Sequence, residues 1–235
     1  FANAFSGMMI DRVNYADASG ISQASGFTFS IGRKSRENKG YFSEGSVGSI
    51  LYNYYTSNLN KTANDFLPIF NILNNSAYSG SEAFTSIFLF QSQLKNQLPN
   101  HASLFSSLML EQNIFGTDEY ASNESNNGDL SISLPVYKML SVDGAAINVC
   151  SAANYGKYNK LGNSQFLKLN IAQTGSYNIR ATKSGGASVI SKPEFVLYQK
   201  GRAIAYAENT LNDNVTGNLT VARGNYVLEV YDLNN

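Results

Sequence analysis

The sequence predicts an α+β protein in which a small helical domain, residues 1–129, precedes an antiparallel, jelly-roll-like β-sandwich, residues 130–235. Three observations carry this prediction. Apolar residues recur at helical spacing in the middle of the chain, and short alternating segments separated by Gly, Asn and Asp fill its last third. Between them, residues 116–129 are rich in loop-forming residues, which indicates an exposed connection between two domains.

The helical domain is expected to begin with little regular structure. Residues 1–40 show no sustained helical period, residues 27–31 alternate as a short strand, and the basic run 33–39 is typical of a solvated loop. Ser43 then follows as an N-cap, before apolar side chains at helical spacing from Val47 to Tyr55. Further helices are predicted over residues 66–73, 83–98 and about 100–114.

The sandwich is expected to contain a succession of short strands. The predicted strands cover residues 130–134, 136–140, 145–150, 166–171, 177–181, 194–198, 203–207, 219–221 and 226–231. Each is bounded by residues that favour turns, which is the pattern of an antiparallel sandwich or jelly roll.

The composition excludes several classes of partner. Lysine plus arginine and aspartate plus glutamate are equal at 17 each, so no basic surface for nucleic acid is predicted. No apolar run reaches the roughly 18 residues of a membrane span. The surface is instead rich in Asn, Ser and Tyr, which is common in secreted bacterial proteins and favours a secreted or cell-surface location. Because the chain starts at Phe1 within sequence of folded character, we expect a processed product or a fragment.

The chain contains no complete catalytic motif. Its single histidine, His101, cannot supply the two histidines of a zinc-protease helix, and it is expected to be an exposed residue at a helix start. The single cysteine, Cys150, lies in a predicted strand, where it is expected to be a small buried hydrophobic residue. Whether the protein is an enzyme stays open on these residues.

Glu44 is the carboxylate of most interest. At the start of an apolar helix it would interact favourably with the helix dipole, and this alone would account for it. Residues 40–48, Gly-Tyr-Phe-Ser-Glu-Gly-Ser-Val-Gly, also resemble the helix that follows the H-E-x-x-H helix in several bacterial zinc metallopeptidases. Over residues 40–115 this resemblance implies that Glu44 is the third zinc ligand. The two histidines and the general-base glutamate would then come from sequence before Phe1, so these residues alone would be inactive.

A second resemblance covers the last third of the chain. The segments that begin at Phe166, Gly175, Pro193 and Arg223 resemble, in that order, strands of the bacterial pre-peptidase C-terminal domain. This jelly-roll module is appended to secreted peptidases, so the resemblance implies an accessory role in docking, secretion or tethering. The alternative is a non-enzymatic secreted or surface protein whose sandwich binds glycans or a protein partner.

Two loops and several tyrosines complete the candidate binding residues. Residues 123–129 and 209–214 gather oxygen ligands that could hold calcium, although both also fit flexible polar loops because neither has the spacing of an EF-hand. Tyr155, Tyr158 and Tyr198 could stack on sugars from a sandwich edge, or could be ordinary half-buried strand residues.

Overall fold

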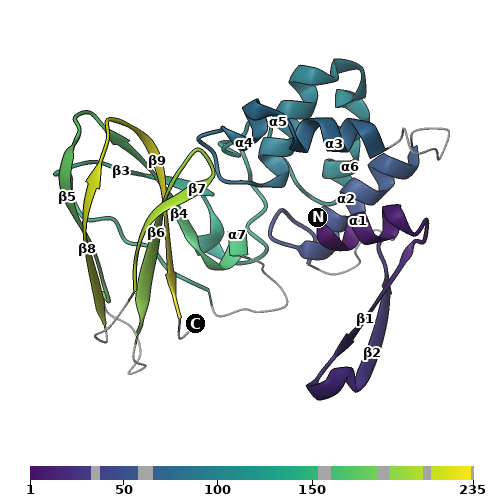
Figure 1. Ribbon diagram of the computed structural model, residues 1–235, viewed down its shortest axis with the longest axis horizontal. Helices are drawn as coiled ribbons and strands as arrows, with labels where there is room; N and C mark the ends of the chain where they lie inside the picture. The colour runs from purple at the N-terminus through teal and green to yellow at the C-terminus, as the bar shows by residue number, and fades with distance from the viewer. Residues whose placement is uncertain (33–37, 58–65, 153–159, 185–190, 209–212, 234–235) are drawn as a thin grey trace.

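The computed structural model places most helices in the N-terminal half of the chain and most strands in the C-terminal half, where the short helix α7 (Lys160–Asn163) is the exception among the described residues, and this confirms the α+β class (Figure 1). It describes residues 1–32, 38–57, 66–152, 160–184, 191–208 and 213–233. The predicted basic loop 33–39 lies largely outside these residues.

The helices pack around one aromatic-rich core. They are α1 (Ala2–Met9), α2 (Glu44–Ser57), α3 (Leu67–Leu73), α4 (Ser76–Ser79), α5 (Ile87–Gln97) and α6 (Ala102–Glu111). The α2 helix follows the prediction closely, because the Ser43 Oγ accepts the Ser46 N–H at 3.3 Å and the apolar face buries Ile50 and Tyr54. The sequence pattern did not predict α1 or α4.

The α5 helix begins at Ile87 instead of the predicted Ala83. Ser86 has an extended backbone, and its Oγ accepts the Leu89 N–H at 3.3 Å, so Ser86 is the N-cap. Upstream of the cap, the Phe84 N–H donates to the Tyr137 hydroxyl at 3.0 Å, in the other half of the chain. The cap at Ser86 sets this boundary, and a residue distant in sequence bonds the backbone before it, so helical periodicity alone could not locate the helix start.

An extended hairpin projects from the helical side. Strands β1 (Asn14–Ser19) and β2 (Ser25–Ser30) pair with each other in antiparallel register, and Figure 1 shows them reaching away from the helices. The predicted strand at 27–31 is confirmed with a small shift, whereas β1 was not predicted.

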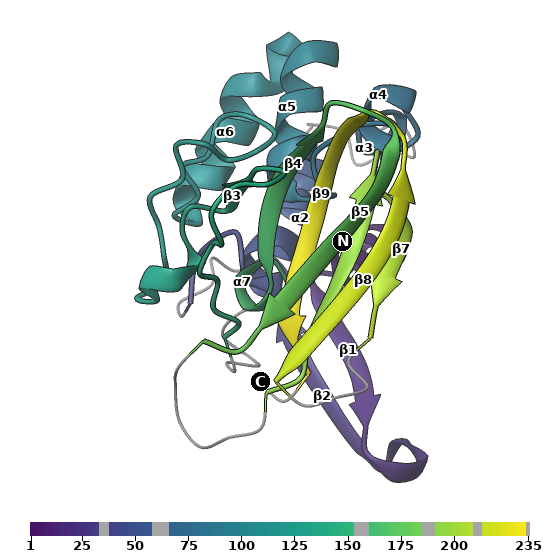
Figure 2. The ribbon, with the colours of Figure 1, turned by 90° about the vertical axis from the view of Figure 1, so that its left-hand side faces the viewer.

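Two sheets form the sandwich. The strands are β3 (Tyr137–Leu140), β4 (Gln165–Ile171), β5 (Gly175–Thr182), β6 (Pro193–Gln199), β7 (Arg202–Ala207), β8 (Asn214–Val221) and β9 (Gly224–Asp232). One sheet has the order β3-β4-β9-β6-β7 and the other contains β5 and β8. All pairs are antiparallel except β3 with β4. Figure 2 shows the β5–β8 layer in front of the larger sheet, and apolar side chains from both layers form one buried cluster.

Two predicted strands are wrong. Residues 130–134 contain a 3₁₀ turn at Ser131–Ser133, because the Ser133 Oγ donates to the carbonyl oxygens of Asn127 and Leu130, both at 2.8 Å, and holds the backbone in a turn. Residues 145–150 form no helix or strand, although they are an apolar run. Apolar composition favours contact with a core, but a strand also requires a backbone partner.

The predicted exposed connection is also corrected. Residues 116–129 have no helix or strand, yet Ala121 is 3% exposed and Glu124 is 9% exposed. This segment packs against the helices as part of the fold, because its polar side chains bond its own backbone.

Aromatic side chains join the helices to the larger sheet. The Phe84 ring lies 4.9 Å from the Phe166 ring and 5.1 Å from the Tyr198 ring, measured between centroids. Phe166 and Tyr198 belong to β4 and β6, so the helical part covers the face of the larger sheet that points away from β5 and β8.

Candidate functional site

Glu44 lies in the first turn of α2 and is exposed, as the sequence predicted for a helix N-terminus. Its Oε1 accepts a hydrogen bond from the Asn3 amide at 2.6 Å, which ties the start of α2 to α1. This position satisfies the electrostatic interpretation of Glu44. It also leaves the carboxylate accessible, next to the first helix of the chain.

The described residues do not complete a metal site around Glu44. Within them, no group of three or more His, Cys, Asp and Glu side chains is arranged to hold a metal ion. Zinc takes four ligands in structural sites and three protein ligands in catalytic ones, so a single carboxylate does not fit it. The assignment of Glu44 as a zinc ligand therefore stays a prediction that depends on other sequence.

His101 is not the exposed residue that was expected. It is half-buried, and its Nδ1 lies 2.6 Å from the hydroxyl of the fully buried Tyr54. The two rings meet edge to face, 5.8 Å apart. The hydrogen bond satisfies a buried hydroxyl at the junction of α2 and α6, which gives His101 a structural role.

Cys150 also differs from its prediction, because its thiol is exposed and free. It lies in the irregular segment 145–150, which does not enter the sandwich as a strand. The apolar run before it predicted burial, and the absence of a strand at residues 145–150 explains why Cys150 is not buried.

The first calcium candidate, residues 123–129, uses its oxygen atoms internally. One Glu124 oxygen accepts the N–H groups of Phe115 and Gly116 at 3.0 and 3.1 Å. The other accepts those of Ser125 and Asn126 at 2.9 and 2.8 Å. Glu124 is thus the organising residue of this loop. Its signal in the sequence is weak, since one acidic residue in a polar loop is usually solvated.

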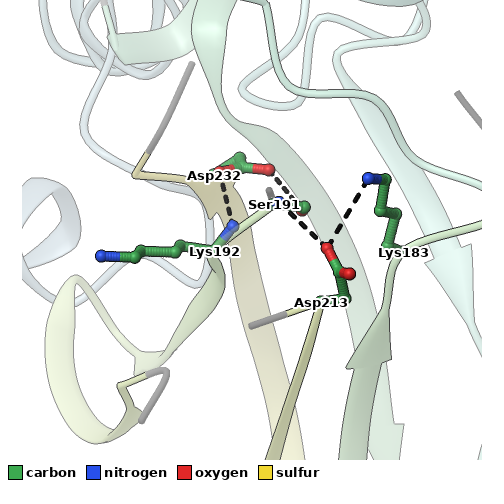
Figure 3. Close-up of polar contacts among 5 residues, drawn as sticks. All are labelled: Lys183, Ser191, Lys192, Asp213 and Asp232. Carbon is green, nitrogen blue, oxygen red and sulfur yellow. Dashed lines mark hydrogen bonds and ion pairs between the residues drawn. The ribbon is translucent and has the colours of Figure 1, made fainter. Parts of the chain in front are cut away.

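The second calcium candidate is described only at Asp213 and Asn214, because residues 209–212 lie outside the described part of the chain. The Asp213 carboxylate accepts the Ser191 N–H at 3.0 Å and lies 3.7 Å from the Lys183 ammonium. Figure 3 shows Ser191 between Asp213 and Asp232, whose carboxylate accepts hydrogen bonds from the Ser191 hydroxyl and the Lys192 N–H. This cluster holds strand ends together at one end of the sandwich.

The tyrosine predictions have mixed outcomes. Tyr155 and Tyr158 lie outside the described residues. Tyr198 is half-buried against Phe84, and its hydroxyl donates to Glu229 at 2.8 Å. Burial, followed by this hydrogen bond to a carboxylate, raises the pKa of Tyr198 above its ordinary value. Tyr198 therefore follows the half-buried alternative.

A groove that sequence reasoning missed lies along β5. Its volume is about 520 Å³. One wall is residues 140–146, which are the last residue of β3 and the irregular segment after it, and the other wall is residues 176–180 of β5. Its floor consists of apolar side chains from three strands, Leu169, Ile171, Leu197, Leu219 and Val221. The alternation of β5 identified its two faces, but no sequence signal indicated that, within the described part of the chain, only β8 would pair with it.

A smaller polar groove of about 210 Å³ lies where the helical part meets the larger sheet. Its lining includes Glu82, Lys168, Asn170 and Asn225, and the Asn225 amide donates to Glu82 at 2.9 Å. The Lys168 ammonium lies 4.0 Å from the centroid of the Tyr120 ring, an arrangement that favours a cation–π interaction. Burial, ahead of the nearby carboxylates, raises the pKa of Tyr120 to about 12.

Comparison with models of known protein families, with curated proteins and with solved structures finds no match to this chain. Among the described residues, the structure contains no helix with both the length and the apolar character needed to cross a membrane.

Proposed function

We propose that this chain is the C-terminal portion of a secreted bacterial metallopeptidase-like protein, in which the sandwich is an accessory docking module. Glu44 is the single observation that carries the metallopeptidase half of the proposal. Its carboxylate is exposed in the first turn of α2 and contacts Asn3. Because α1 lies against α2 and Asn3 bonds Glu44, the residues just before Asn3 are close to Glu44. A histidine-bearing helix supplied from there would meet this carboxylate.

The test uses the full-length gene product. We expect an H-E-x-x-H helix upstream of Phe1, bound zinc in the purified protein and zinc-dependent proteolysis. Glu44→Gln should lower zinc affinity by more than about 100-fold, because loss of even an outer-shell partner costs 10–100-fold. Glu208→Gln, which neutralises an exposed carboxylate after β7, is the matched control and should leave zinc content and activity unchanged. Full zinc content and activity in the Glu44→Gln protein would refute the role of Glu44.

The second candidate is a non-enzymatic surface protein that binds a polar ligand such as a glycan. It is favoured by the smaller groove, where the amides of Asn170 and Asn225 and the Glu82 carboxylate surround one opening. Amides and carboxylates are suited to hydroxyl groups because together they donate and accept hydrogen bonds. A full-length sequence with no zinc-binding motif would leave this candidate in place of the first.

A further inference from the structure

One edge of β5, which is unpaired among the described residues, forms one side of the 520 Å³ groove. β5 pairs with β8 over residues 175–182, and no other described strand pairs with it. The groove is lined by consecutive residues of β5, with half-buried Tyr177 and Ile179 on one face and exposed Ser176 and Asn178 on the other. A cavity that touches both faces of a strand runs along its backbone edge. We propose that this groove binds an extended segment of a partner protein, which adds to the β5–β8 sheet as a third strand.

The backbone of β5 can supply the hydrogen bonds that such a strand needs. In an antiparallel pair the N–H and C=O groups of alternate residues point to the same side, so half of those on β5 point away from β8. An exposed edge of this kind is a template for another strand. Strand addition is a recurrent form of peptide recognition, in which main-chain hydrogen bonds give affinity and pockets for alternate side chains give specificity.

The floor of the groove indicates which side chains the partner carries. Alternate side chains of an added strand would point between the two layers, onto Leu169, Leu197 and Leu219. The chain itself already places two such side chains nearby, because Ile147 and Val149, two positions apart, pack against the same apolar cluster. The partner segment therefore carries apolar residues at every second position.

The charge and the length of the groove limit the chemical class and the size of the ligand. Among the described residues, the groove is lined by one cation, Arg180, and one anion, Asp143, so it does not favour a polyanion such as nucleic acid or an acidic glycan. Residues 176–180 line the wall, and at about 3.3 Å per residue they span roughly 17 Å. The ligand is thus a peptide segment of about five residues without net charge. This inference rests on the docking role in the proposed function but does not involve Glu44.

The test measures binding of a labelled peptide to the 235-residue chain. The probe is fluorescein-labelled Ser-Val-Thr-Ile-Thr-Val-Ser with a blocked carboxyl terminus, followed by fluorescence anisotropy. Two control peptides carry N-methyl groups on the Val and Ile residues, or on the Thr residues and the last Ser. Only one of these sets points its N–H groups toward β5, so one methylated peptide should lose at least tenfold in affinity and the other should retain most of it.

Two tryptophan variants locate the site on the protein, which has no tryptophan of its own. Ala146→Trp places an indole in the groove wall and should weaken binding of the probe at least tenfold. Met139→Trp places the same side chain on an exposed position of β3 that does not line this groove, and it should bind within twofold of the unmodified chain.

Failure of the unmodified probe to bind up to its solubility limit would overturn the proposal, as would equal binding by the Ala146→Trp chain or by both methylated peptides. Glu44→Gln should leave probe binding unchanged. If the full-length protein bound no zinc but the chain still bound the probe, the metallopeptidase proposal alone would be rejected. If zinc bound as expected but the probe did not bind, the groove proposal alone would be rejected.

Discussion

In two irregular segments of this chain, the burial of the residues is the opposite of what their sequences suggest. Residues 116–129 are polar, yet they are packed into the fold around the nearly buried Glu124. Residues 141–150 include the apolar run 145–150, which predicts a strand, yet most of residues 141–150 are exposed and they form no strand. The difference lies in where the backbone polar groups are satisfied. In the first segment a carboxylate collects four N–H groups, whereas the second runs past an open strand edge without joining its ladder.

The largest loss of stability is expected from a substitution at Glu124, in the first of these two segments. Glu124→Ala removes the acceptor of four backbone N–H groups, of which that of Gly116 is buried. Since a hydrogen bond to a charged group contributes about 1.5–3 kcal/mol and these four are not additive, we expect a loss of about 4 kcal/mol in the free energy of unfolding. Urea denaturation measures this loss.

The control for this prediction is Glu208→Ala, an exposed carboxylate that should cost no more than about 0.5 kcal/mol. If Glu124→Ala were equally mild, the first segment would be an ordinary solvated loop, as its composition suggests.

A smaller effect is expected in the second segment. Ile147 is half-buried against the sandwich cluster. Ile147→Ser should therefore cost about 1 kcal/mol, because only part of its side chain is removed from water. A buried strand position would cost about 2–5 kcal/mol for a comparable truncation. A measured loss in that higher range would mean that residues 145–150 join the sandwich as a strand.

The sequence was most informative where short-range patterns decide the structure. The α2 helix follows from Ser43 and the apolar spacing after it, and the strands from β4 to β9 follow from alternation and turn residues, except that β8 was predicted only at residues 219–221. Most of the wrong predictions fall where contacts between residues distant in sequence decide the structure. The Tyr137 hydroxyl takes the N–H of Phe84 ahead of α5, and Cys150 is exposed because its segment has no partner strand.

The same limit applies to the candidate sites. The position of Glu44 was predicted from the sequence because it depends on the local helix start, whereas its role as a zinc ligand stays a prediction. The β5 groove could not be found in this way, since its walls combine residues 140–146 with residues 176–180 and its floor draws on three further strands. Sequence patterns identify faces of elements, but an unfilled edge depends on which elements meet.

The open edge of β5 is tested most directly by amide hydrogen exchange of the ¹⁵N-labelled chain, resolved by residue with NMR. We expect alternate amides over residues 175–182, those that do not bond β8, to exchange rapidly in the free chain. Addition of the unmethylated peptide should protect these amides selectively. Protection of the same amides in the free chain would contradict the account, because it would mean that the edge is already paired.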